Sequence, residues 1–182
     1  LPPGRTPIVT KLVSDVRRDE ILQRVREACA QGNQAYWVCP LIEESEALQL
    51  ATANDTYELM QNEFPELKIG LVHGRMKPAE KQAVTVAFSA GETQLLVATT
   101  VIEVGVDVPN ASLMVIEHAE RMGLSQLHQL RGRVGRSKTR AYAYITTPPD
   151  KKLTEGAEKR LKVLQSLDTL GAGFSLASHD LD

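Results

Sequence analysis

Short apolar segments without polar alternation recur along this chain, separated by longer segments of helical periodicity. Strands that are apolar at every position are typical of a parallel sheet buried on both faces, and alternation with helices favours parallel pairing. We therefore predict an α/β fold with a parallel sheet covered by helices on both faces. The predicted strands are residues 8–13, 34–39, 68–72, 94–98, 113–116 and 141–145.

Residues with known effects on helix ends delimit the segments between these strands. Ser14 or Asp15 is expected to cap a helix that Gly32 ends. Pro78 is expected to open another helix, which Gly91 ends. The other predicted helices are residues 44–63, a segment with Leu124, Leu127 and Leu130 at helical spacing, and residues 155–167.

The length of 182 residues suits one well-buried domain. Three prolines within residues 1–7 exclude a helix or central strand there, so this stretch is interpreted as a linker from a missing upstream domain. Residues 8–170 are predicted to form the domain, and residues 171–182 to begin a truncated C-terminal extension.

Composition excludes several classes of protein. Cys29 and Cys39 have apolar neighbours and no metal-binding spacing, so they are interpreted as buried small side chains. No apolar run reaches membrane-spanning length, and no signal peptide is recognisable, so a soluble, cytoplasmic protein is expected. Charge is uneven: residues 27–67 hold eight acidic residues and no Lys or Arg, whereas residues 121–149 hold six basic residues and no acidic one.

Three arginines lie within six residues in the segment 129–136, Gln-Leu-Arg-Gly-Arg-Val-Gly-Arg. A guanidinium group suits phosphate because its fork donates two parallel hydrogen bonds and keeps its charge. A solvated basic loop at the end of a helix is the simpler alternative, since runs of charge are common on surfaces. The segment by itself does not decide between them.

Polar residues also follow two of the predicted strands, at the edge of a parallel sheet where ligands bind. Thr99-Thr100 follows one strand, with Gly105 and Asp107 close behind, and His73-Gly74 follows another. Hydroxyl and backbone N–H groups suit phosphate oxygens, and a carboxylate suits a ribose hydroxyl. Capping of a helix by the threonines, and a plain turn at His73-Gly74, are the alternatives.

The chain lacks the motifs that a complete nucleotide site would need. It contains no GxxxxGK[ST] phosphate loop, no Asp-Glu pair at a strand end for magnesium, and no recognisable Ser-His-Asp or Cys-His arrangement. An arginine cluster without a phosphate loop suggests arginine fingers that act on a nucleotide held by another domain.

Four segments together resemble a known family. Residues 99–109 (Thr-Thr-Val-Ile-Glu-Val-Gly-Val-Asp-Val-Pro) are similar to motif V of superfamily 2 helicases, and residues 129–136 fit their motif VI, Gln-x-x-Gly-Arg-x-x-Arg. With residues 35–45 and 72–77, the chain resembles the second motor domain of RecG-type DNA helicases. The resemblance implies a RecA-like domain. After Arg136 the chain is more similar to the transcription-repair coupling factor, which leaves the repair pathway open.

The resemblance also implies roles for individual residues. Arg133 and Arg136 match arginines that reach the ATP phosphates, with Arg136 as the finger, and Gln129 matches a position that couples nucleotide state to domain closure. Gly105 and Asp107 match positions near the nucleotide. Positions that lie along the DNA backbone are matched by His73, Gly74, Arg75, Thr99 and Thr100.

The expected function is therefore the C-terminal motor half of an ATP-dependent DNA helicase or translocase in repair and recombination. ATP with Mg would be held mainly by a missing first helicase domain, and the partners would be that domain and DNA. Two alternatives stay open: a non-catalytic module that binds nucleic acid or protein, and one half of an RNA helicase.

Overall fold

The computed structural model describes residues 8–99, 108–134, 141–148 and 153–166. Its strands are β1 (Ile8–Ser14), β2 (Gln34–Val38), β3 (Ile69–Val72), β4 (Leu95–Ala98), β5 (Ala111–Ile116) and β6 (Ala141–Thr147). Its α-helices are α1 (Arg18–Ala30), α2 (Glu46–Glu63), α3 (Pro78–Ser89), α4 (Leu124–Arg131) and α5 (Glu155–Ser166). Two short 3-10 turns, η1 (Asp15–Arg17) and η2 (Ala119–Arg121), precede α1 and α4. The domain boundaries at residues 7 and 170 fall outside the described ranges and stay predictions.

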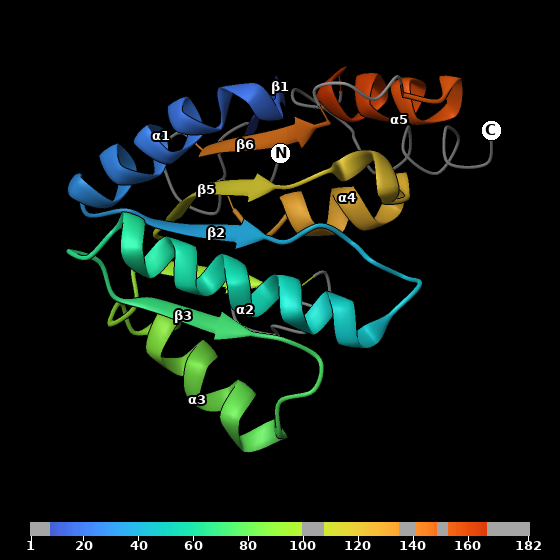
Figure 1. Cartoon of the computed structure of the whole chain (residues 1–182). Helices are drawn as coiled ribbons and strands as arrows, with labels where there is room; N and C mark the ends of the chain where they lie inside the picture. Colours follow the sequence, from blue (N-terminus) through green and yellow to red (C-terminus); the bar gives the residue numbers. More distant parts are fainter. Residues whose placement is uncertain (1–7, 100–107, 135–140, 149–152, 167–182) are drawn as a thin grey trace.

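The described strands form one sheet in the order β1-β6-β5-β2-β4-β3, and every neighbouring pair is parallel. Helices α1 and α2 cover one face, where Trp37 of β2 packs, and α3, α4 and α5 cover the other, where Tyr36 packs (Figure 1). Every residue of β2, β4 and β5 is buried, as continuous apolar strands require. The predicted α/β fold with two covered faces is confirmed.

The start of α1 differs from the prediction. Ser14 and Asp15 were expected to cap this helix, but a 3-10 turn comes first, and the residue before α1 is Arg17, which makes no side-chain cap. Asp15 instead approaches Arg18 and His118. The Asp15 carboxylate thus faces Arg18, three residues along the chain, and His118, which is distant in sequence, and it does not cap the helix.

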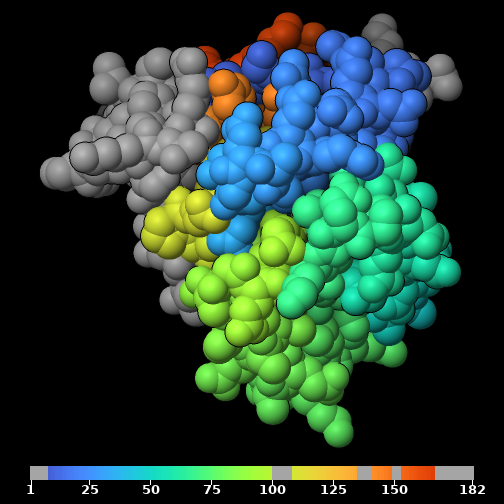
Figure 2. All heavy atoms as spheres, turned by 90° about the vertical axis from the view of Figure 1, so that its left-hand side faces the viewer, coloured from blue at the N-terminus to red at the C-terminus, as the bar shows by residue number. Residues whose placement is uncertain are grey.

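The amino ends of the strands are held together by amide side chains, on the side of the molecule that Figure 2 presents. Gln34 donates to the carbonyl oxygens of Phe88 (2.6 Å) and Thr93 (2.7 Å), and Asn110 donates to that of Gly32 (2.7 Å). These bonds link the turns that end α1 and α3 to the starts of β2 and β5. The residues with predicted site roles, by contrast, follow the carboxyl ends of the strands.

Both cysteines are buried and free, as predicted. Burial, together with the charge of Glu66, raises the pKa of the Cys29 thiol to about 11. Burial raises the pKa of the Cys39 thiol to about 12, with Glu117 adding to the shift and Thr56 and Arg18 opposing it. Within the described ranges, no helix combines the length and apolar character that a bilayer-spanning segment needs.

Candidate functional site

A cavity of about 230 Å³ opens at the carboxyl ends of β3 and β4, which are neighbours in the sheet. The segment after β3 contributes His73, Gly74 and Arg75, and the end of β4 contributes Thr99. The structure therefore brings together four of the five residues that were predicted to lie along a DNA backbone. The fifth, Thr100, lies outside the described residues.

The other lining residues come from the connection between β2 and α2 and from the first turns of α2, to which the sequence had suggested no role in the site. Gln49 of α2 shapes this connection, because its side chain accepts from the N–H of Ile42 (2.7 Å) and donates to the carbonyl of Pro40 (3.0 Å). Ser45 caps α2 by accepting from the N–H of Leu48 at 3.1 Å. The lining residues from these segments are Leu41, Ile42, Glu43, Glu46, Gln49 and Leu50.

His73 begins a tight turn and is held as a neutral imidazole. Its Nδ1 accepts a hydrogen bond from the backbone N–H of Arg75 at 3.2 Å, which requires an unprotonated Nδ1. Partial burial lowers the pKa of His73; the charge of Glu80 opposes this shift and that of Lys81 reinforces it. A neutral imidazole that accepts at Nδ1 carries its proton on Nε2. His73 therefore offers Nε2–H as a donor, the polarity that a phosphate oxygen needs.

Thr99 and Arg75 differ in exposure and in their hydrogen-bond partners. The side chain of Thr99 is buried, and its hydroxyl has no hydrogen-bond partner among the described residues. A buried hydroxyl without a partner is costly, so a ligand group that enters the cavity would gain by bonding to it. Arg75 is exposed at the rim and forms an ion pair with Glu46.

Two of the candidate nucleotide residues, Gln129 and Arg133, lie near the end of α4, and neither is among the described residues that line this cavity. Leu124, Leu127 and Leu130 fix the buried face of the helix, as their spacing predicts. Gln129 is exposed, and Arg133 is half-buried one residue past the C-cap, where its N–H bonds the carbonyl of Leu130 at 3.0 Å. Gly105, Asp107 and Arg136, the other predicted nucleotide contacts, lie outside the described residues.

Arg131 differs from the other arginines of the segment. It is 4% exposed, and its Nη1 donates to the Thr10 hydroxyl and to the Leu164 carbonyl, both at 2.9 Å. These bonds tie the end of α4 to β1 and α5. Arg131 is thus a structural side chain, neither part of a solvated loop nor available to a phosphate; composition alone did not separate it from Arg133, whereas the resemblance to motif VI assigned phosphate contacts to Arg133 and Arg136 only.

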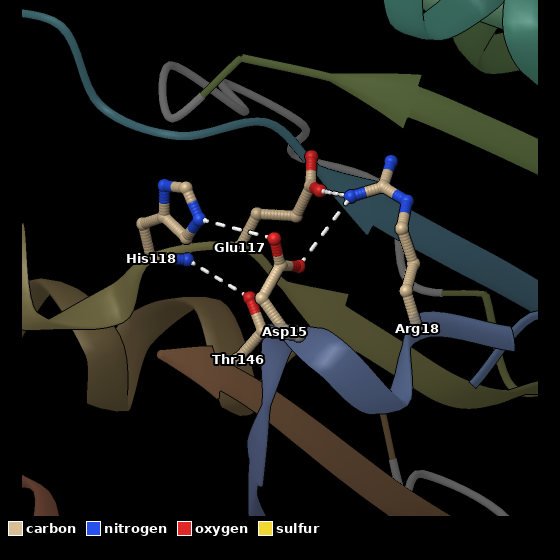
Figure 3. A network of polar contacts seen from close by, with 5 residues as sticks. All are labelled: Asp15, Arg18, Glu117, His118 and Thr146. Carbon is tan, nitrogen blue, oxygen red and sulfur yellow. Dashed lines mark hydrogen bonds and ion pairs between the residues drawn. The ribbon is translucent and has the colours of Figure 1, made fainter. Parts of the chain in front are cut away.

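A charged network lies at the carboxyl ends of β1, β5 and β6 (Figure 3). The buried carboxylate of Glu117 pairs with Arg18, whose guanidinium also lies 3.7 Å from Asp15 and 5.1 Å from the ring centre of Trp37. His118 contacts Asp15 at 3.8 Å. This network joins the start of α1 to the segment that leads into α4.

His118 completes the network with an unusual backbone conformation. Its φ of 49° is left-handed, and its N–H donates to the hydroxyl of Thr146 at 3.1 Å. Left-handed backbone is unfavourable for a residue with a Cβ, so surrounding contacts must hold it. The sequence alone does not predict this turn, because its contacts are with Thr146 on β6 and with Asp15 after β1, which are distant from His118 in the chain.

Substituting Arg18 with methionine is expected to destabilise the chain by about 3 kcal/mol, because the buried Glu117 would lose its partner. This expected loss of stability is at the low end for a buried ion pair, since water reaches the Arg18 side chain, which is 29% exposed. Urea unfolding followed by circular dichroism measures the change. Arg17→Met is the matched control: that neighbour pairs with Glu20 in the open, so a change of under about 0.5 kcal/mol is expected. Equal losses in the two variants would contradict the argument.

No group of three or more His, Cys, Asp or Glu side chains within the described ranges could hold a metal ion. Among the groups that these ranges offer to an anionic ligand are His73 Nε2–H, the Thr99 hydroxyl and the guanidinium groups of Arg75 and Arg133. This donor set suits phosphate groups more than it suits a metal.

Known proteins are similar to this chain over its whole length. ATP-dependent DNA helicase RecG of Escherichia coli O157:H7 is 57% identical over 185 residues, a match that covers 100% of this chain and 26% of the relative. RecG of Aquifex aeolicus is 47% identical and is covered to 22%. The chain thus spans about a quarter of the length of these relatives.

Solved structures show the same relationship. A structure of RecG bound to a three-way DNA junction superposes with a TM-score of 0.81 and 43% identity, covering 100% of this chain and 23% of that one. The C-terminal domain of the DEAD-box protein Dbp5 superposes with a TM-score of 0.59 at 16% identity, over 90% of this chain and 84% of that one, which shows the fold alone. The predicted RecA-like fold and the resemblance to RecG are confirmed; the resemblance after Arg136 to the transcription-repair coupling factor stays a prediction. The model of the helicase conserved C-terminal domain matches residues 17–138, and the chain belongs to that family.

Proposed function

We propose that this chain is the C-terminal motor half of an ATP-dependent DNA helicase that acts on branched DNA in repair and recombination. The observation that carries the proposal is the match over the whole chain to RecG, including the structure of RecG on a three-way DNA junction. The protein would act in the cytoplasm, where bacterial DNA is found, and its partners would be DNA and a first helicase domain.

In this proposal the chain supplies one side of the ATP site. Bound ATP with Mg, held mainly by the first domain, supplies the phosphoryl group that is transferred to water. Arg133 and Arg136 would donate hydrogen bonds to its phosphate oxygens, and Gln129 would couple nucleotide state to closure of the two domains. Gly105 and Asp107 would lie near the ribose. The partial exposure of Arg133 and the exposure of Gln129 are compatible with these roles.

The cavity at β3 and β4 would hold the DNA backbone. His73, Gly74 and Arg75 would contact one phosphate region, and Thr99 and Thr100 the next. The neutral His73, which carries its proton on Nε2, and the Thr99 hydroxyl, which has no hydrogen-bond partner within the described part of the chain, support this assignment. Contacts of this kind are made to phosphates and not to bases, so they carry no sequence preference and weaken as salt rises.

Turnover of ATP by the full-length protein tests the proposal. Three-way junction DNA is expected to stimulate turnover strongly and structured RNA much less, and this chain by itself is expected to show none, because it has no phosphate loop. Equal stimulation by RNA would favour one half of an RNA helicase. Absence of turnover by the full-length protein with either nucleic acid would favour a non-catalytic binding module.

A further inference from the structure

The guanidinium group of Arg75, at the rim of the cavity, is paired with a carboxylate of the same chain. Its Nε lies 3.1 Å from one carboxylate oxygen of Glu46, and its Nη2 lies 3.3 Å from the other. Two parallel contacts between a guanidinium and a carboxylate form the bidentate arrangement that arginine also uses for phosphate. Glu46 therefore occupies the Nε–Nη2 edge of Arg75, one of the edges through which a guanidinium binds a phosphate with two parallel bonds.

The position of Glu46 is set by the fold. It is the first residue of α2, directly after the Ser45 cap, and it lines the same cavity as Arg75. A carboxylate in the first helical turn is favourable for the helix, because it faces the positive end of the helix dipole. The hydrogen bond and charge of Arg75 lower the pKa of Glu46, and those of Glu46 raise the pKa of Arg75, so both groups stay charged near neutral pH.

We infer that Glu46 competes with the DNA phosphate for Arg75 and so limits the affinity of this motor half for DNA. The inference rests on the proposed contact between Arg75 and DNA. In the free protein the carboxylate holds the guanidinium at the cavity rim; on binding, a phosphate replaces the carboxylate and releases it to water. A helicase must also let go of each phosphate as it moves, and a carboxylate that recaptures Arg75 assists that release.

The expected effect is moderate and depends on salt. Arg75 and Glu46 are both exposed, with side-chain accessibilities of 54% and 69%, so water and ions screen the pair. Loss of the competing carboxylate is expected to tighten DNA binding about two- to fivefold at low ionic strength. The gain should shrink as salt rises, because an exposed pair is then screened more completely.

The experiment measures the affinity of the full-length protein for three-way junction DNA, without nucleotide, at several salt concentrations. The variants are Glu46→Gln, Arg75→Gln and the double variant, with Glu58→Gln, an exposed carboxylate farther along α2, as the control for a simple loss of negative charge. We expect Glu46→Gln to bind more tightly than Glu58→Gln, and we expect Arg75→Gln to abolish that difference. A gain in affinity cannot come from unfolding.

Two results would overturn the inference, and they differ in what else they overturn. In the first result, Arg75→Gln weakens DNA binding, but Glu46→Gln binds DNA no more tightly than Glu58→Gln does. The same conclusion follows if Glu46→Gln raises the affinity equally with and without Arg75→Gln. Either outcome disproves the competition and leaves the proposed DNA contact standing. If Arg75→Gln binds like the wild type, the contact between Arg75 and DNA is disproved, and the competition with it.

Discussion

Replacing Arg136 with alanine in the full-length protein is expected to lower DNA-stimulated ATP turnover by about three orders of magnitude. An arginine that reaches across to ATP on the first helicase domain stabilises the charge that develops on the transferring phosphoryl oxygens. Arg136 lies outside the described residues. The expectation therefore rests on its place in the segment 129–136, next to Arg133, and on the relationship to RecG.

Two further variants sharpen this prediction. Arg136→Lys is expected to recover little of the turnover, because an ammonium group cannot reproduce the planar fork of arginine. DNA affinity without nucleotide, measured in parallel, should stay at the wild-type value for both Arg136 variants. Turnover within a few-fold of wild type for Arg136→Ala would remove this arginine from the ATP site and would weaken the proposed function as a whole.

The strands were predictable because their apolar residues form continuous runs. Each observed strand lies within about two residues of its predicted bounds, and the parallel pairing follows from the same pattern. Helix faces were less predictable. In α3, Ala79 and Ala83 belong to the apolar spacing, yet both are exposed and only Phe88 is fully buried. This helix packs beside β3, the edge strand, where the sheet covers less of it.

The candidate site was predictable only in part, because its key contacts join residues that are distant in sequence. Strand-end positions placed His73 and Thr99 at one edge of a parallel sheet, and the structure finds both in one cavity. The pairing of Arg75 with Glu46 spans 29 residues, and that of Arg18 with Glu117 spans 99. The sequence does not show which charged side chains are buried. It also does not show which charged residues pair, because pairing depends on the order of the strands in the sheet, and the periodicity of apolar residues does not predict that order.

The arginines of the segment 129–136 give the sharpest case of this limit. Arg131 and Arg133 are two residues apart, and both fit a phosphate-binding cluster by composition. Arg131, however, is the last residue of α4, and Arg133 lies beyond the Gly132 C-cap, so the two side chains do not share one environment. The structure buries Arg131 against β1 and α5 and leaves Arg133 half-exposed. One arginine is therefore expected to support the fold and the other the chemistry.

Substituting Arg131 with methionine is accordingly expected to destabilise this chain by about 4 kcal/mol, since two hydrogen bonds from a charged donor are lost at a buried position. Methionine keeps most of the apolar volume, so the loss reports the polar contacts to Thr10 and Leu164 more than a cavity. Urea unfolding followed by the fluorescence of Trp37, the single tryptophan and a fully buried one, measures the change.

Arg133→Met is the matched control, because it makes the same substitution two residues away at a half-exposed position. It should leave the free energy of unfolding within about 0.5 kcal/mol of wild type and lower ATP turnover of the full-length protein. Thr10→Val should lower the free energy of unfolding by less than Arg131→Met does, since it removes only the hydroxyl that accepts from Arg131. If Arg131→Met were as stable as Arg133→Met, the buried contacts of Arg131 would contribute nothing to the fold, and all three arginines would again be candidates for the phosphates.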